Sequence, residues 1–323
     1  MAKILIIGGG GMVGQKLAHS LAADPFHAGD EVTLFDMAFP AEGGAPAAQK
    51  LPGNITDKGA IRRLAAGRPD LIFHLAAIVS GEAETDFDLG WNVNMMAFRD
   101  LLEALRAEVV SSAHAYKPRI VFTSSIAVFG APFPEKIDDT FFQAPQTSYG
   151  AQKAVCELML SDYIRKGFFD GMSIRLPTIC VRPGKPNKAA SGFFSGIIRE
   201  PLNGVEAILP VSRDVRHWHA SPRSAVGFLR HAATLDTTLL NARPALNMPG
   251  VSCTVEEQIE ALREVAGNDA VALIREEPDE AIRAIVKNWP RDFAPERALA
   301  LGFHAEDSFR QIIETYIADD LKR

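Results

Sequence analysis

Cysteine is scarce in this 323-residue sequence, which contains only Cys156, Cys180 and Cys253. Three cysteines that are widely separated and odd in number make neither a disulfide framework nor a cluster with metal-ligand spacing. This excludes the small secreted proteins that disulfides hold together. We therefore expect a protein of the reducing cytoplasm.

An excess of basic residues and a long apolar run are also lacking. The net charge is −6, so nucleic acids and anionic membranes would be repelled at long range. No run approaches the roughly 18 apolar residues that a membrane span requires, and residues 1–7 lead into glycines without the cleavage site of a signal peptide. We therefore expect a small-molecule partner, and no nucleic acid or membrane.

Short apolar runs alternating with helix-length segments are what the sequence does contain. Strands are predicted at residues 4–7, 31–35, 70–75, 119–123 and 172–176, and a first helix at residues 12–23. This rhythm predicts an α/β protein with a Rossmann-type, doubly wound parallel sheet. Residues 40–52, rich in Ala, Gly and Pro, are expected to form a surface loop.

The pattern changes after residue 176. A loop with two prolines comes first, and residues 254–266 and 279–287 then have the pattern of amphipathic helices. We assign residues 1–176 to the sheet domain, to which a strand near residues 245–249 returns. Residues 177–323 then form mostly a smaller, substrate-binding lobe.

Glycines stand at Gly8, Gly11 and Gly14, between the first predicted strand and the helix that Met12 and Val13 begin. Without a Cβ the backbone turns tightly and approaches a pyrophosphate, which the free N–H groups at a helix start can hold. A glycine turn without a ligand has the same composition, but the strand before it and the helix after it favour a dinucleotide site. We expect all five residues to bind the cofactor.

An acidic residue closes the second predicted strand. Asp36 follows the glycines by about twenty residues, where a carboxylate accepts hydrogen bonds from the adenosine ribose hydroxyls and repels a 2′-phosphate. No arginine comes immediately after it. The sequence therefore predicts NAD rather than NADP as the cofactor.

Tyr149 and Lys153 are four residues apart, on one face of a helix that is predicted to begin near Ser148. A phenol is a poor base at neutral pH, but a nearby positive charge lowers its pKa by stabilising the phenolate. Such a pair also occurs on solvated helix faces. Here Ser125 ends an apolar strand, at the sheet edge where α/β ligands bind, and this context favours a catalytic Ser125, Tyr149 and Lys153.

These segments resemble the extended short-chain dehydrogenases, the NAD-dependent epimerase/dehydratase family, over the full length of the chain. The shared features are the Gly8/Gly11/Gly14 spacing, Asp36, His74-Leu75-Ala76-Ala77, Asn92-Val93, Ser124-Ser125, Val128-Phe129-Gly130 and Tyr149 through Lys153. The resemblance implies an NAD-dependent enzyme acting on a CH–OH group, and a homodimer formed through the helices around residues 92–103 and 148–163.

The resemblance also implies a role for each matching residue. Tyr149 is the acid/base, Lys153 holds the nicotinamide ribose, and Ser125 positions the substrate oxygen. His74 is then a strand-end histidine rather than a base. Asn54 stands where the family usually carries an acidic residue, and its amide both donates and accepts. The cofactor groove is further lined by Asn54, Ile55, Leu75, Ala76, Ala77, Asn92, Pro177 and Thr178.

The substrate side is expected to involve polar residues that follow the strands. These are Ser80, Ser125, Tyr149, Arg182, Asn187, Ser191 and Arg216. A substrate carboxylate needs a fixed cation, for which Arg182 is the first candidate and Arg216 the second, although arginines are also common on surfaces. His217 and His219 occupy alternate positions with no third ligand nearby, so no metal site is expected.

Residues 213–219 match the region where sugar-nucleotide enzymes of the family carry an arginine for a diphosphate. The acidic residues that usually follow are replaced by Pro222-Arg223. This puts the nucleotide pocket in doubt. Within the family, the chain most resembles dehydrogenases of small sugar acids, and the resemblance implies oxidation of the 2-hydroxyl of such an acid. One alternative is a nucleotide-sugar epimerase or dehydratase with tightly held NAD. A non-catalytic cofactor sensor, which usually lacks the tyrosine or the lysine, is the least favoured.

Overall fold

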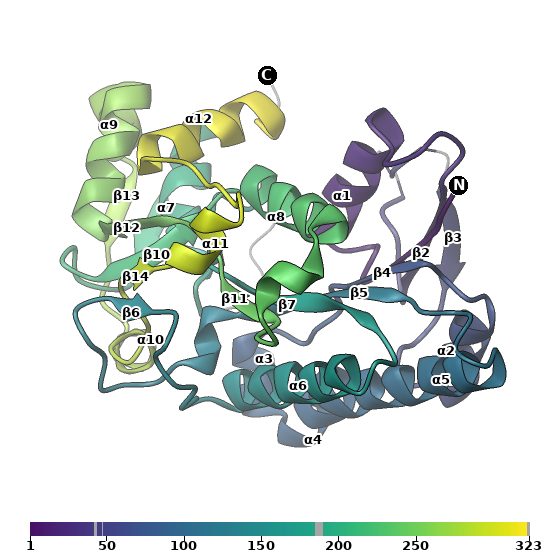
Figure 1. The fold of residues 1–323 in the computed structure, drawn as a ribbon. Helices are drawn as coiled ribbons and strands as arrows, with labels where there is room; N and C mark the ends of the chain where they lie inside the picture. Colours follow the sequence, from purple (N-terminus) through teal and green to yellow (C-terminus); the bar gives the residue numbers. More distant parts are fainter. Residues whose placement is uncertain (42–43, 47, 185–189, 322–323) are drawn as a thin grey trace.

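The computed structural model describes residues 1–41, 44–46, 48–184 and 190–321. Its centre is a seven-stranded sheet with the order β11-β7-β5-β4-β1-β2-β3, in which all neighbouring strands are parallel (Figure 1). The strands are β1 (Lys3–Ile7), β2 (Glu31–Asp36), β3 (Gln49–Pro52), β4 (Leu71–His74), β5 (Arg119–Ser125), β7 (Asp170–Leu176) and β11 (Ala245–Asn247). The α/β fold with a doubly wound parallel sheet, predicted from the sequence, is confirmed.

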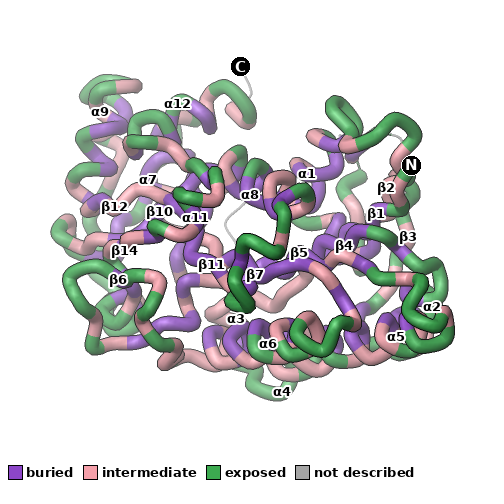
Figure 2. The backbone as a smooth tube through the Cα atoms, viewed as in Figure 1, coloured by how far each residue is buried: buried purple, intermediate pink, exposed green. Residues whose placement is uncertain are grey.

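Helices cover both faces of this sheet (Figure 1). They are α1 (Met12–Ala23) and α8 (Pro222–Thr234) on one face, and α2 (Lys58–Ala66), α5 (Ala97–Ser111) and α6 (Ser148–Arg165) on the other. After the exposed Lys3, strand β1 is apolar because Ile4 and Ile6 pack into the core on the first face while Leu5 and Ile7 pack into the core on the second. Figure 2 shows the buried backbone concentrated along these strands.

A smaller lobe is built around the three-stranded sheet β12-β10-β8. Its elements are β8 (Thr178–Ile179), α7 (Gly192–Leu202), β10 (Arg216–Ala220), β12 (Val251–Thr254), α9 (Val255–Val271) and α12 (Phe309–Asp319). Thr254 and Glu257 form a capping box at the start of α9. The helix was expected to end at residue 266, and its regular geometry does break at Gly267, where φ is +82°.

Short elements connect these parts. They are α3 (Ser80–Thr85), α4 (Phe87–Gly90), the π-helix η1 (Trp91–Met96), the 3₁₀ turns η2 (Ile126–Val128) and η3 (Thr237–Leu240), β6 (Ile137–Asp138), β9 (Ala207–Leu209), β13 (Ile274–Glu276), α10 (Glu280–Val286), β14 (Phe293–Ala294) and α11 (Glu296–Ala300). Across the described ranges, no helix combines the length and the apolar composition needed to cross a membrane.

The expectation of a surface loop over residues 40–52 was wrong for the last four residues of that range. Residues Gln49–Pro52 form β3, which pairs with β2 at the edge of the sheet. An edge strand leaves much of its surface in water, and three of these four residues are exposed, so the apolar pattern of a strand is absent. Proline is tolerated there because an edge strand has a side that needs no N–H donor.

The second half of the chain contributes to the central sheet. Strand β11 pairs with β7, and α8 packs against α1 and β7. At the other side of the sheet the chain runs from β1 out to β3 and then returns to β4, which also neighbours β1. The carboxyl ends of β1 and β4 therefore flank the point where strand order reverses, and ligands of open α/β sheets bind in such a crevice.

Candidate active site

The glycine turn between β1 and α1 has no room for side chains at two key positions. Gly8 has φ of +89°, and a Cβ there would lie 2.6 Å from the backbone nitrogen of Ala76. A Cβ on Gly14 would overlap the carbonyl oxygen of Gly8, so α1 packs directly against the turn. No side chain caps α1, and its first turn, with Met12 and Val13, carries no acidic residue. This cradle fits a dinucleotide pyrophosphate.

Asp36 is fixed beside the same turn. One carboxylate oxygen accepts from the N–H of Gly10 at 2.9 Å, and the other accepts from the N–H of Met37 at 2.7 Å. Its negative charge therefore lies at the end of β2 next to the predicted pyrophosphate site. This placement suits a ribose ligand that disfavours a 2′-phosphate.

Asp36→Ala is expected to relax the preference for NAD over NADP. The substitution removes both the acceptors for the ribose hydroxyls and the charge that repels the 2′-phosphate, so the ratio of kcat/KM values should shift toward NADP by about tenfold. The comparison variant is Asp57→Ala, because Asp57 caps α2 through the N–H of Gly59 and pairs with Arg63 at 3.8 Å, and neither partner belongs to the predicted cofactor site. A ratio that stays constant in Asp36→Ala would remove Asp36 from the ribose site.

The other residues predicted to line the cofactor groove differ in exposure. The N–H groups of Leu75 and Ala76 both donate to the carbonyl of Ile7, at 2.8 and 3.1 Å, which places this segment, and Ala77 after it, beside the glycine turn. Ile55 and Pro177 are both buried. Asn54 is exposed, and its side-chain oxygen accepts hydrogen bonds from Thr56.

A buried amide pair that the sequence did not indicate holds the next segment. Asn92 is exposed on η1, but Asn94 is 2% exposed and bonds to both backbone groups of Ile78, at 2.7 Å and 3.1 Å. Its amide also donates to Gln152 at 2.7 Å. Asn94 and Gln152 thus position the segment that leads to Ser80, at the start of α3. The only available signal was their position next to Asn92 and Lys153.

Lys153 is one of the most buried side chains in the protein, at 2% exposure. Its Nζ donates to the carbonyl of Thr123 at 2.8 Å and lies 5.6 Å from the centre of the Tyr149 ring. Burial lowers the pKa of Lys153 to about 8, while Cys156 and Glu157 act to raise it. A solvated helix face is therefore excluded for this lysine.

Tyr149 lies in the first turn of α6, which Thr147 caps by accepting from the N–H of Gly150 at 3.1 Å. Burial raises the pKa of the Tyr149 phenol to about 12, and the charge of Arg182 and a hydrogen bond with Ser125 act in the opposite direction. The sequence pointed to Lys153 as the charge that acts on the phenol. The structure adds Arg182, which approaches from the smaller lobe.

Arg182 is held rigidly at the border of the two lobes. Its Nε donates to the carbonyl of Ile179 at 2.9 Å and its Nη2 to the hydroxyl of Ser191 at 3.0 Å, while its own N–H donates to Ser195 at 3.0 Å. Of the carboxylates in the described part of the chain, none lies within salt-bridge distance of Arg182. The side chain is thus a fixed cation, near enough for its charge to lower the pKa of Tyr149.

The remaining predicted substrate residues are placed differently. Arg216 begins β10 and pairs with Glu257 at 3.1 Å, so its charge is already matched. Asn187 lies outside the described residues. Ser80 is half-buried at the start of α3, and Thr178 is half-buried on β8. The structure therefore brings together Ser125, Tyr149, Lys153, Arg182 and Ser191, and leaves Arg216 bound to Glu257.

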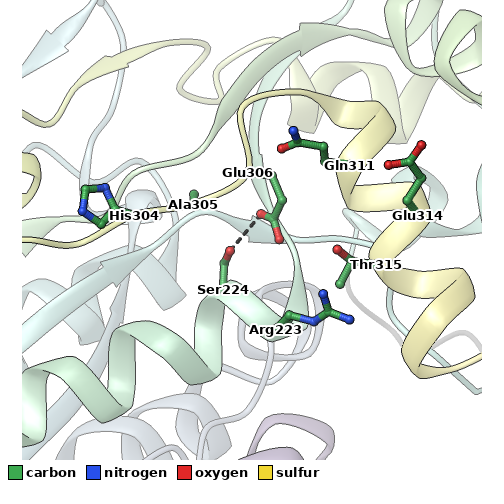
Figure 3. A pocket seen from close by; sticks show the side chains of 8 residues that line it. All are labelled: Arg223, Ser224, His304, Ala305, Glu306, Gln311, Glu314 and Thr315. Carbon is green, nitrogen blue, oxygen red and sulfur yellow. Dashed lines mark hydrogen bonds between the residues drawn. The ribbon is translucent and has the colours of Figure 1, made fainter.

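A separate hollow of about 440 Å³ lies where α8 meets α12, lined in part by Arg223, Ser224, Glu306 and Gln311 (Figure 3). The Glu306 carboxylate accepts from the Ser224 hydroxyl at 2.9 Å and from the N–H of Ser221 at 3.2 Å. An anion thus already occupies the N-terminal end of α8. The lining residues include none of the predicted site residues, so this hollow is not the candidate active site.

A sequence profile described as "NAD dependent epimerase/dehydratase family" matches residues 4–221. The chain belongs to this family. Its members are NAD-dependent by description, so NAD is the cofactor.

Two relatives and one solved structure are similar to this family member over nearly its whole chain. A D-erythronate dehydrogenase of Haemophilus influenzae is 42% identical over 320 residues, covering 99% of this chain and 100% of that protein. Another of Cupriavidus necator is 44% identical and covers 98% of both. A crystal structure described as a nucleoside-diphosphate-sugar epimerase from Agrobacterium tumefaciens is 54% identical with a TM-score of 0.93, over 98% of this chain and 94% of that one.

Proposed function

We propose that this protein oxidises the 2-hydroxyl of a small sugar acid with NAD, and that the substrate is D-erythronate, converted to 2-oxo-tetronate. The observation that carries the proposal is Arg182, a rigid cation without a carboxylate partner in the described chain, whose charge acts on the Tyr149 phenol. A carboxylate one bond away from the reacting carbon suits this arrangement. The names of the two dehydrogenase relatives support the same substrate.

Each residue has a distinct task in the proposed reaction. Arg182 binds the substrate carboxylate through the N–H groups that Ile179 and Ser191 do not use. This fixes the 2-hydroxyl near Ser125 and Tyr149. The phenolate of Tyr149 takes the hydroxyl proton as the C2–H bond breaks, and Ser125 donates a hydrogen bond to the substrate oxygen.

Lys153 acts on the cofactor side. One of its three N–H donors is committed to Thr123, and the other two are left for the hydroxyls of the nicotinamide ribose. Bound NAD supplies the acceptor for the C2 hydride. The cofactor-groove residues Asn54, Asn92, Pro177 and Thr178 belong to this proposal as well.

The second candidate function is that of a nucleotide-sugar epimerase, which the description of the Agrobacterium structure favours. Such a substrate carries a diphosphate that needs free cations. The two arginines in the matching segment are both neutralised, because Arg213 pairs with Glu256 and Glu276, and Arg216 pairs with Glu257. This pairing supports the sugar acid over the nucleotide sugar.

Net formation of NADH separates the two functions. We expect the purified protein to reduce NAD in the presence of D-erythronate, measured by absorbance, and to leave NAD oxidised with UDP-glucose or UDP-galactose. An epimerase uses the hydride only transiently and therefore releases no NADH. Conversion of a nucleotide sugar without turnover of any sugar acid would replace the proposed function by the second candidate.

We also place the protein in the cytoplasm as a homodimer. The helices that the resemblance implies for the interface carry apolar residues in water: Val110 of α5 is 50% exposed and Leu158 of α6 is 65% exposed. Pairing of these helices with a second copy would bury both.

A further inference from the structure

A buried chain of hydrogen bonds ends at Thr178. The ring of His217 on β10 is 2% exposed and stacks on Phe194 with a centroid distance of 5.2 Å and an interplanar angle of 4°. Its Nδ1 lies 2.8 Å from the carbonyl oxygen of Pro290, and its Nε2 lies 2.7 Å from the hydroxyl oxygen of Thr178. Both ring nitrogens are therefore engaged.

The hydrogen-bond partners determine which atom carries each proton in this series of hydrogen bonds. A carbonyl oxygen only accepts, so Nδ1 of His217 must carry the hydrogen that the Pro290 carbonyl receives. Burial lowers the pKa of His217 to about 4, so the ring is neutral at neutral pH and its Nε2 is a bare acceptor. Thr178 must then donate its hydroxyl hydrogen to His217, which leaves only lone pairs on the Thr178 oxygen.

Thr178 is also the accessible end of this chain of hydrogen bonds, and it comes shortly after β7, which pairs with the strand that ends at Ser125. His217 and Pro290 are buried, whereas Thr178 is half-buried. Leu176 pairs with Ser125 in the central sheet, and Thr178 follows it by two residues, or about 6–7 Å along an extended chain. A small sugar acid whose second carbon sits at Ser125 and Tyr149 extends its 3- or 4-hydroxyl from that point, and Thr178 is the half-buried acceptor that follows this end of the sheet.

We infer that Thr178 is a specificity residue that only accepts, and that His217 holds it in this state. It receives a hydrogen bond from an O–H or N–H group of the bound ligand, and it rejects a ligand that presents an acceptor at the same point. Two groups are available to donate this hydrogen bond. The first is the 3- or 4-hydroxyl of the sugar acid, and for this donor the inference rests on the proposed function. The other donor is the carboxamide N–H of NAD.

Ligand pairs that differ by one donor test the inference. The substrate arm compares kcat/KM for D-erythronate with its 3-deoxy and 4-deoxy analogues. The cofactor arm compares the Kd of NAD with that of 3-acetylpyridine adenine dinucleotide, in which a methyl group replaces the carboxamide NH₂, by fluorescence titration. The second arm needs no turnover, so it remains informative if no sugar acid is a substrate and the proposed function fails.

Thr178→Val should abolish one preference of the wild-type protein. We expect the wild type to favour the ligand with the donor by about 5- to 20-fold in one arm, because the bound ligand covers the Thr178 oxygen and would otherwise leave this acceptor unpaired. In Thr178→Val the two ligands of that arm should become equal, and Thr178→Ser should restore the preference. The arm that responds identifies the donor. Equal preferences in wild type and Thr178→Val in both arms would overturn the inference.

His217→Phe tests the positioning role separately. The phenyl ring keeps the stacking on Phe194 but has no acceptor, so the Thr178 hydroxyl becomes free to donate as well. We expect the preference in the responding arm to fall while kcat for the favoured substrate changes less than its KM. A circular-dichroism melting curve checks folding. A folded His217→Phe protein with the full wild-type preference would show that His217 does not orient Thr178. If His217→Phe fails to fold, the Thr178 variants still test the acceptor role.

Discussion

Tyr149→Phe is expected to lower kcat for sugar-acid oxidation by roughly 10²–10⁴-fold, because the group that takes the proton is lost. The phenyl ring keeps its place over Lys153, whose Nζ lies 5.6 Å from the ring centre, and Lys153 keeps its bond to Thr123. The Kd of NAD should therefore stay within about twofold of the wild-type value, since only one neutral hydroxyl is removed. Stopped-flow NADH absorbance and NAD titration measure the two quantities.

Tyr163→Phe is the matched control, because Tyr163 lies on the same helix and bonds to Glu103, away from the candidate site. It should turn over substrate as the wild type does. Tyr149→Phe with near-normal turnover would contradict the assignment of Tyr149 as the acid/base. A parallel loss in Tyr163→Phe would attribute the effect to a disturbed helix instead.

Arg182→Gln is expected to reduce kcat/KM for D-erythronate by roughly 10²-fold, about 3 kcal/mol, through the loss of a charge-assisted bond to the carboxylate. It should also change the pH profile. The positive charge of Arg182 lowers the pKa of Tyr149, so its removal raises that pKa. Oxidation needs the phenolate, and the rising limb of kcat/KM should therefore move to higher pH.

Two measurements distinguish the roles of Arg182. The dependence of kcat/KM on pH reports the phenol, and the KM for D-erythronate reports the carboxylate. A lower affinity with an unmoved pH profile would leave Arg182 as a carboxylate ligand that does not act on Tyr149. A loss at Arg216→Gln in place of Arg182→Gln would transfer the carboxylate to the second candidate.

The central sheet was predictable because its strands are buried on both faces and read as apolar runs. The first helix was predictable because spaced glycines directly after an apolar strand are typical of a strand-to-helix turn. By contrast, β3 lies at an edge with Gln49 and Lys50 in water, so no pattern marks it. The π-helix η1 at Trp91–Met96 was also not indicated, since its residues have no distinct composition.

In the candidate site, too, some residues could be predicted from the sequence and others could not. Tyr149 and Lys153 are neighbours on one helix, so local spacing was enough to place them together. Arg182 meets Tyr149 only because the smaller lobe folds over the sheet, and Thr178 meets His217 across 39 residues of chain. Contacts of this kind depend on how strands β8 and β10 pair, which residue spacing does not encode.

The return of α8 and β11 to the central sheet also affects how the protein is made. A nascent chain that has emerged from the ribosome only as far as β7 has an unpaired strand edge and a bare apolar face, both of which favour aggregation. Phe228 and Leu229 of α8, which are buried in the core on that face, are translated later. The sheet domain therefore cannot mature cotranslationally ahead of the rest, and both halves of the chain must be synthesised before either is protected.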